Sequence, residues 1–161
     1  MNTILTCLMI GVGATLLMDI WGILRGPLFG VAPADYRLLG RWLGHMKRGR
    51  FCHPAIAEAS AVRGERLIGW SAHYAIGIAF AALLVVLAGE PWLQAPTPWL
   101  ALQLGLITVA APFLLMQPAM GAGIAASRTA QPNCVRLQSL ITHLVFGLGL
   151  YLSALALHLL S

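Results

Sequence analysis

Charged side chains are scarce in this sequence: Asp, Glu, Lys and Arg together make up 9% of its 161 residues. Soluble domains carry about 25% charged residues, whereas hydrophobic residues account for 59% of this chain. Its mean hydropathy is +0.82. A chain with so few charges cannot cover a folded surface with them. The composition therefore argues against an ordinary soluble domain and indicates an integral membrane protein.

Cysteine is also scarce, and the three residues form no Cys-x-x-Cys pair. We therefore expect free thiols and no cysteine-type zinc site. The chain also lacks His-Glu-x-x-His, Gly-x-Ser-x-Gly and a phosphate-binding glycine loop. No familiar catalytic class is indicated, so we expect no cofactor and favour a protein that is not an enzyme.

The sequence contains four long apolar runs instead of such motifs. They cover residues 4–24, 67–88, 99–120 and 137–160. About 20 apolar residues cross a bilayer as a helix, and none of the runs alternates as a membrane strand would. We predict an all-α fold with a single transmembrane domain over residues 1–161, built as a bundle of four transmembrane helices.

The polar segment between the first two runs, residues 25–66, is predicted to carry a short amphipathic helix that begins near Asp35. Its apolar side holds Leu39 and Trp42. A basic amphipathic helix suits the headgroup layer of a membrane. The predicted headgroup contacts are Arg37, Arg41, Lys47, Arg48 and Arg50. The alternative is that these residues only anchor the segment and set the topology.

The basic residues also predict the orientation in the membrane. Eight of the ten Lys and Arg residues lie within residues 25–66, and the other two are Arg128 and Arg136. By the positive-inside rule, loops 25–66 and 121–136 face the cytoplasm and both termini face the other side. This topology accounts for the net charge of +5. We therefore expect membrane lipids, and not nucleic acid, as partners.

Four polar residues interrupt the apolar runs at one predicted depth: Asp19, His73, Gln117 and His143. Asp19 and the two histidines lie roughly 8–9 Å inside the predicted cytoplasmic boundary, at 1.5 Å per residue. Gln117 falls at a similar level. Ionisable side chains are costly in lipid, so each is a candidate functional residue. We predict that the four meet in an intramembrane polar site.

The chemistry of these four residues is compatible with several functions. Asp and His can pass a proton, and the nitrogen and oxygen atoms also suit a transition metal, although no motif supports one. The leading hypothesis is a small transport or carrier-type protein or subunit, working as a homodimer because four helices rarely enclose a path. One alternative is a membrane-embedded enzyme acting on a lipid-like substrate, with His73 or His143 as the base. The other is a structural or assembly subunit, in which the polar layer only joins helices.

The two halves of the chain share a short pattern. Residues 16–19 (Leu-Leu-Met-Asp) resemble residues 114–117 (Leu-Leu-Met-Gln), and His73-x-x-x-Gly77 resembles His143-x-x-x-Gly147. The pattern is consistent with two parallel helical-hairpin repeats. The alternative is chance, since leucine-rich helices resemble one another.

Several longer strings carry a family resemblance. They are residues 11–19, 40–45, 63–66, 69–74 and 112–128, which include Gly-Arg-Trp-Leu-Gly-His and Pro-Phe-Leu-Leu-Met-Gln-Pro. Together they resemble a family of small, uncharacterised bacterial inner-membrane proteins, one of the domain-of-unknown-function families. The resemblance spans nearly the whole chain and implies a four-span protein of the bacterial cytoplasmic membrane. It implies no activity and no catalytic residue.

Overall fold

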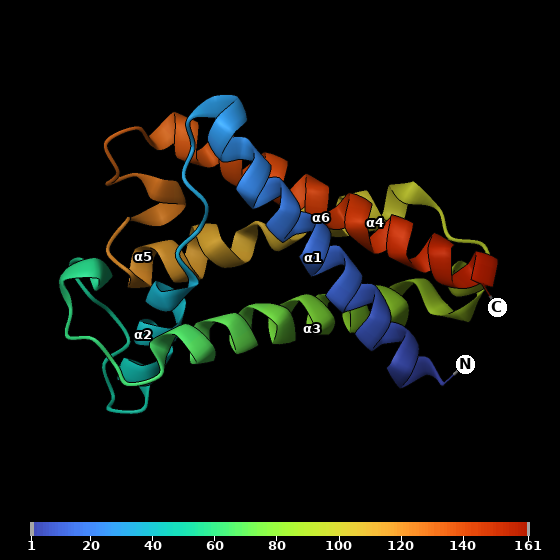
Figure 1. The fold of residues 1–161 in the computed structure, drawn as a ribbon, viewed down its shortest axis with the longest axis horizontal. Helices are drawn as coiled ribbons and strands as arrows, with labels where there is room; N and C mark the ends of the chain where they lie inside the picture. The colour runs from blue at the N-terminus through green and yellow to red at the C-terminus, as the bar shows by residue number, and fades with distance from the viewer. Residues whose placement is uncertain (1, 161) are drawn as a thin grey trace. The chain divides into compact units, whose positions relative to one another are not determined.

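The protein is all-α in its computed structural model, which describes residues 2–160 (Figure 1). The helices are α1 (Thr3–Phe29), α2 (Tyr36–Met46), α3 (Glu65–Gln94), α4 (Pro98–Thr108), α5 (Gln117–Ala119) and α6 (Pro132–Leu160). Short turns of 3-10 helix cover Ile56–Glu58 and Ile124–Ala126, and a π-helical segment covers Ala111–Met116. Four helical segments are long and apolar enough to cross a membrane: Thr3–Phe29, Glu65–Gln94, Pro98–Ala119 and Pro132–Leu160. The predicted fold class is confirmed, including the short helix between the first two spans.

The first span is longer than predicted, because the helix continues through Gly26-Pro27 to Phe29. Pro27 lies in the last turn of α1, where its missing N–H removes a single hydrogen bond from the ladder. The helix ends at Phe29, after which Gly30 adopts a left-handed conformation with φ 67°. The Gly30 N–H donates to the Gly26 carbonyl at 2.9 Å, which closes the helix end.

The other spans lie near their predicted bounds, and glycine and proline explain the differences. The regular part of α3 ends where Gly89 takes φ 75° and ψ 176°, one residue after the predicted end. Helix α6 starts at Pro132, five residues earlier than predicted, because proline suits the first turn of a helix. In the third span Pro112 lies in a π-helical segment, and the Gln117 N–H donates to the Pro112 carbonyl.

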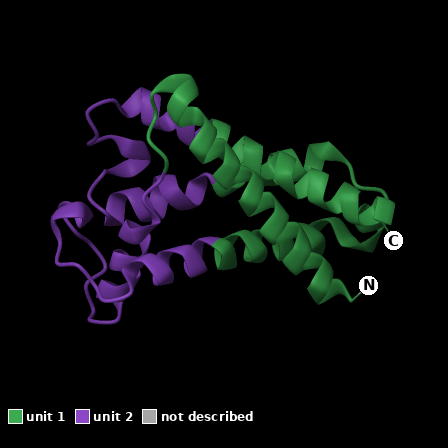
Figure 2. Cartoon of the chain, viewed as in Figure 1, with its two compact units in different colours: residues 1–33, 74–108, 141–161 green, residues 34–73, 109–140 purple. Residues whose placement is uncertain are grey.

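The chain divides into two compact units, coloured separately in Figure 2. Unit 1 comprises residues 1–33, 74–108 and 141–161, so it contains a part of every apolar span. Unit 2 comprises residues 34–73 and 109–140 and contains α2, the Ile56–Glu58 turn and the loop before α6. The single transmembrane domain stays a prediction.

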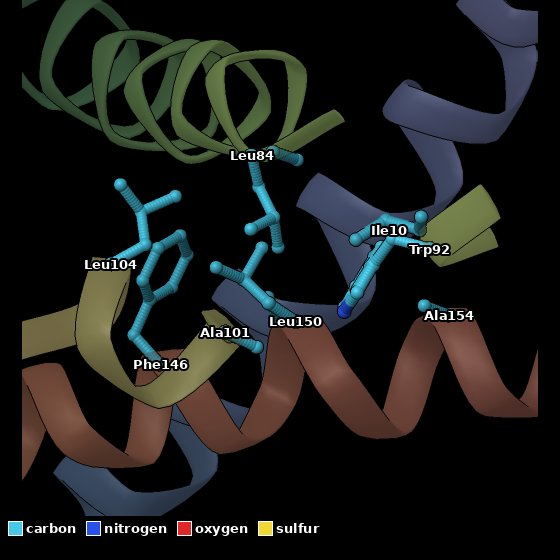
Figure 3. Packing of buried hydrophobic residues seen from close by; sticks show 10 residues of the cluster. Ile10, Leu84, Trp92, Ala101, Leu104, Phe146, Leu150 and Ala154 are labelled. Carbon is cyan, nitrogen blue, oxygen red and sulfur yellow. The ribbon is translucent and has the colours of Figure 1, made fainter. Parts of the chain in front are cut away.

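The core of unit 1 is an apolar cluster in which the four spans meet. Ile10 of α1 and Leu150 of α6 are fully buried. Phe146 and Leu150 point toward Leu84 of α3 and Leu104 of α4 (Figure 3). Large apolar side chains on the outer faces of the same helices are exposed, as a lipid-facing surface requires.

Glycines set the distances between the helices of unit 1. A methyl group at Gly105 would lie 2.6 Å from the Cα of Gly147, and one at Gly11 would lie 2.5 Å from the Cα of Ile78. Real Cβ atoms essentially never come within 3.0 Å of such atoms. The pairs α4–α6 and α1–α3 therefore pack backbone against backbone, as small residues allow in membrane proteins.

Candidate functional site

Asp19 reaches across from α1 to α3 in unit 1. The Tyr74 hydroxyl donates to Asp19 Oδ2 at 3.0 Å. The backbone contact between α1 and α3 sets this position, because Gly77 of α3 faces Thr15, one helical turn before Asp19. The Thr15 hydroxyl is buried and donates to the Gly11 carbonyl at 2.7 Å, so it is satisfied within α1. Gly11, Thr15 and Asp19 follow one another at intervals of four residues, so they share the face of α1 that meets α3.

His143 on α6 is held by α4, also in unit 1. Its Nδ1 lies 2.8 Å from Thr108 Oγ1, and that hydroxyl lies 2.6 Å from the Gly105 carbonyl. Because a carbonyl only accepts, the single Thr108 hydroxyl hydrogen goes to Gly105, and His143 Nδ1–H donates to Thr108. This hydrogen-bond assignment leaves His143 Nε2 as an acceptor. The contact between Gly105 and Gly147 brings the two helices close enough for this pair.

The guanidinium of Arg25 on α1 reaches the stretch of α6 that carries His143. Arg25 Nη1 donates to Thr142 Oγ1 at 3.4 Å, and Nη2 donates to the Ala32 carbonyl at 3.1 Å. Unit 1 therefore places an acid, a histidine and a cation on helices α1 and α6, within segments that are otherwise apolar.

The other two members of the predicted quartet belong to unit 2. The His73 ring stacks on Tyr36 of α2, with ring centroids 3.9 Å apart and planes inclined by 21°. Gln117 directly follows the π-helical turn, and its Oε1 is buried with no hydrogen-bond partner among the described residues. Each unit thus contains two of the four residues, and their meeting in one layer stays a prediction.

A metal at this layer gains no support from the geometry. Across residues 2–160, no three His, Cys, Asp or Glu side chains are grouped so that they could hold a metal ion. The three cysteines are free, as expected: Cys7 is buried, and Cys52 and Cys134 are exposed.

Most of the predicted headgroup residues lie at the surface of unit 2. Lys47, Arg48 and Arg50 are exposed just after α2. Arg37 is also exposed and pairs with Asp35, with 2.7 Å between Nη2 and Oδ2. The hydrogen bond from Arg37 holds the pKa of the Asp35 carboxyl below its usual range. These residues remain predicted lipid contacts.

Arg41 differs from this group because its guanidinium has partners inside unit 2. Its Nε and Nη2 donate to both carboxylate oxygens of Glu65, at 2.8 and 2.9 Å. Its Nη1 donates to the carbonyls of Ile56, Ala57 and Ala59, at 3.3, 2.9 and 3.0 Å. Only 12% of the side chain is exposed. Arg41 therefore joins α2, the Ile56–Glu58 turn and the start of α3, and its headgroup contact stays a prediction.

His45 and His53 form a buried pair that was not predicted from the sequence. His45 Nδ1 and His53 Nε2 are 2.9 Å apart, and each residue is 4% exposed. The chain returns to the end of α2 after Gly49, which takes φ 75°. Trp42 Nε1 donates to the Phe51 carbonyl at 2.8 Å and holds this return in place. The sequence signal for the pair was Gly49, the residue type that permits such a reversal.

The described residues define an all-helical protein whose four long apolar helices are compatible with a multi-pass membrane protein. The chain belongs to DUF2938, described as a protein of unknown function, because the family model matches residues 8–157. The predicted membership of an uncharacterised domain family is confirmed, whereas its bacterial origin stays a prediction. No curated protein and no solved structure matches the chain.

Proposed function

We propose that this chain is a small transport or carrier-type protein, or a subunit of one, that passes protons through an intramembrane polar site. It spans the bacterial cytoplasmic membrane four times. The charge distribution supports the orientation: all ten Lys and Arg residues lie within residues 25–66 and 121–136. Both of these loops therefore face the cytoplasm in this proposal.

One observation carries the proposal: ionisable side chains on two spanning helices are each hydrogen-bonded to a neighbouring helix. Asp19 accepts from the Tyr74 hydroxyl, and His143 pairs with Thr108. Asp and His inside membrane helices are costly, and chains of them are typical of proton relays. Each hydrogen bond holds its side chain in one orientation, and the His143 tautomer leaves a ring nitrogen able to accept a proton.

His73 and Gln117 complete the polar layer in the proposal. Gln117 Oε1 is buried and has no hydrogen-bond partner among the described residues. A buried acceptor without a donor is costly inside a membrane, and this supports a place for Gln117 in the polar site. Four helices rarely enclose a path alone, so we propose a homodimer as the working form. Membrane lipids are its surrounding partners.

Proton flux in reconstituted vesicles tests the proposed function. Liposomes containing a trapped pH-sensitive dye and the protein are given a potassium diffusion potential with valinomycin. We expect faster internal pH change than in protein-free liposomes. Asp19→Asn and His143→Gln should each slow it by at least roughly tenfold, because a positioned proton-transfer group is lost. Cys134→Ser, at an exposed position of α6, is the control and should keep the wild-type rate.

Two other results would contradict the proposal, and each would favour one of the alternative functions. If wild-type vesicles match protein-free ones and the two variants only melt earlier, the polar residues are structural. If instead the vesicle lipids change mass in a way that requires His73 or His143, the protein is a lipid-modifying enzyme.

A further inference from the structure

The hydrogen bonds of the His45–His53 pair define where its hydrogens lie. His45 Nε2 is 2.9 Å from the Ser60 carbonyl, which can only accept, so Nε2 carries a hydrogen. In neutral His45 the Nδ1 atom is then an acceptor. The 2.9 Å contact with His53 Nε2 is therefore a bond that His53 donates. The order of donation runs from His53 to His45 to Ser60.

This arrangement leaves one basic atom unused. His53 Nδ1 carries no hydrogen in the neutral pair, is buried, and has no hydrogen-bond partner among the described residues. One added proton gives an N–H at this atom whichever ring carries the charge, because the ring-to-ring bond uses the other nitrogen. A second added proton makes both facing nitrogens donors, and the contact between the rings is lost.

The charges around the pair oppose protonation. Burial, His45 and Arg50, in that order, hold the pKa of His53 below its usual value. The segment 117–121, which packs against His53, carries no charged side chain. The other charged residues of the neighbouring elements are Arg37, Arg41, Lys47 and Arg48 on and after α2, and Glu58 on the 3-10 turn. Of these, Glu58 is exposed, and Arg41 is held by Glu65.

The pair also lies where two segments of unit 2, residues 51–60 and 117–121, dock against each other. The His53 N–H donates to the Ala119 carbonyl at 2.8 Å, and the Ile56 N–H donates to the Met120 carbonyl at 3.0 Å. His53 itself makes the first of these bonds. Proton uptake by its ring therefore acts directly where the two segments meet.

We propose that the His45–His53 pair is a proton-binding site that releases residues 51–60 from the 117–121 segment when it is protonated. The released loop binds protons more readily than the docked loop, because His53 leaves its buried, positively charged surroundings. Docking is therefore complete above the usual histidine pKa and weakens as pH falls toward the lower pKa of the docked state. This site lies outside the proposed transport layer and does not depend on it.

Hydrogen exchange of the full-length protein in detergent micelles tests the proposal at pH 7.5 and 5.5. After correction for intrinsic exchange rates, peptides covering residues 51–60 should lose roughly tenfold of their protection at the lower pH. Peptides from α1 should not change. His53→Gln, which keeps polar atoms but cannot take the proton, should remove the pH response, whereas the matched His158→Gln should keep it.

Equal protection of residues 51–60 at the two pH values in the wild-type protein would overturn the proposal. So would a response that survives in His53→Gln. If His53→Gln does not fold, the wild-type comparison and a direct NMR titration of the two imidazoles still decide, because the proposal requires a histidine that titrates below its usual pKa.

Discussion

Replacing Arg41 with alanine is expected to lower the free energy of unfolding by roughly 3 kcal/mol. The loss has two causes. Glu65, with 13% of its side chain exposed, keeps its charge without the bidentate partner. The carbonyls of Ile56, Ala57 and Ala59 lose their shared donor at the same time. An unpaired charge left in such surroundings costs more than the pair itself contributes.

Chemical or thermal unfolding in a mild detergent measures this effect. Three further variants separate the contributions of charge, hydrogen-bond geometry and burial. Arg41→Lys keeps the charge but not the fork of donors, so its stability should fall between the wild type and alanine. Glu65→Gln leaves no buried charge unpaired on the carboxylate side and should cost less than Arg41→Ala. Arg37→Ala is the matched control at an exposed ion pair and should change stability little.

The same variants decide between the interior role of Arg41 and its predicted headgroup role. If Arg41→Ala leaves stability unchanged but weakens binding to vesicles with anionic lipid, the lipid contact is the correct interpretation. The reverse result is a large loss of stability with lipid binding retained through Lys47, Arg48 and Arg50. It would support the interior role of Arg41.

The fold was predictable because length and hydropathy alone require helices in a bilayer. The errors lie at glycine and proline, whose effect depends on position. Pro27 lies beyond the predicted end of the first span at residue 24, yet in the last turn of a helix it removes a single bond. Gly89, in contrast, ends the regular part of α3 within one residue of the prediction, because its φ of 75° cannot continue a helix.

The site was predictable only where polar residues stand out from their surroundings. Asp19 and His143 are conspicuous in apolar runs, but their partners Tyr74 and Thr108 depend on which helices touch. That in turn depends on glycine contacts across the bundle. His45 and Arg41 lie in a segment where charged and polar residues are frequent, so neither is unusual there. Burial in the folded chain, which composition does not reveal, sets them apart from their neighbours.

The crossing of α2 and α3 in unit 2 explains why Arg41 and Glu65 meet. A methyl group at Gly40 would overlap the Glu65 carbonyl oxygen and lie 2.7 Å from the Gly69 nitrogen. One at Gly69 would overlap the Tyr36 carbonyl oxygen. The obstacles are backbone atoms of two helices, which cannot move aside as a side chain can. The helices must separate to admit even one methyl group.

Gly40→Ala and Gly69→Ala are therefore each expected to destabilise the protein by about 3 kcal/mol or more, at the upper end of overpacking effects. Gly22→Ala on α1 is the control, because a methyl group there meets no atom within 4 Å. It should raise stability slightly through helix propensity. Unfolding in detergent measures all three, and equal stability of Gly40→Ala and Gly22→Ala would contradict the close crossing. Combining Gly40→Ala with Arg41→Ala should cost less than the sum of the single variants, because separating the helices already parts Arg41 from Glu65.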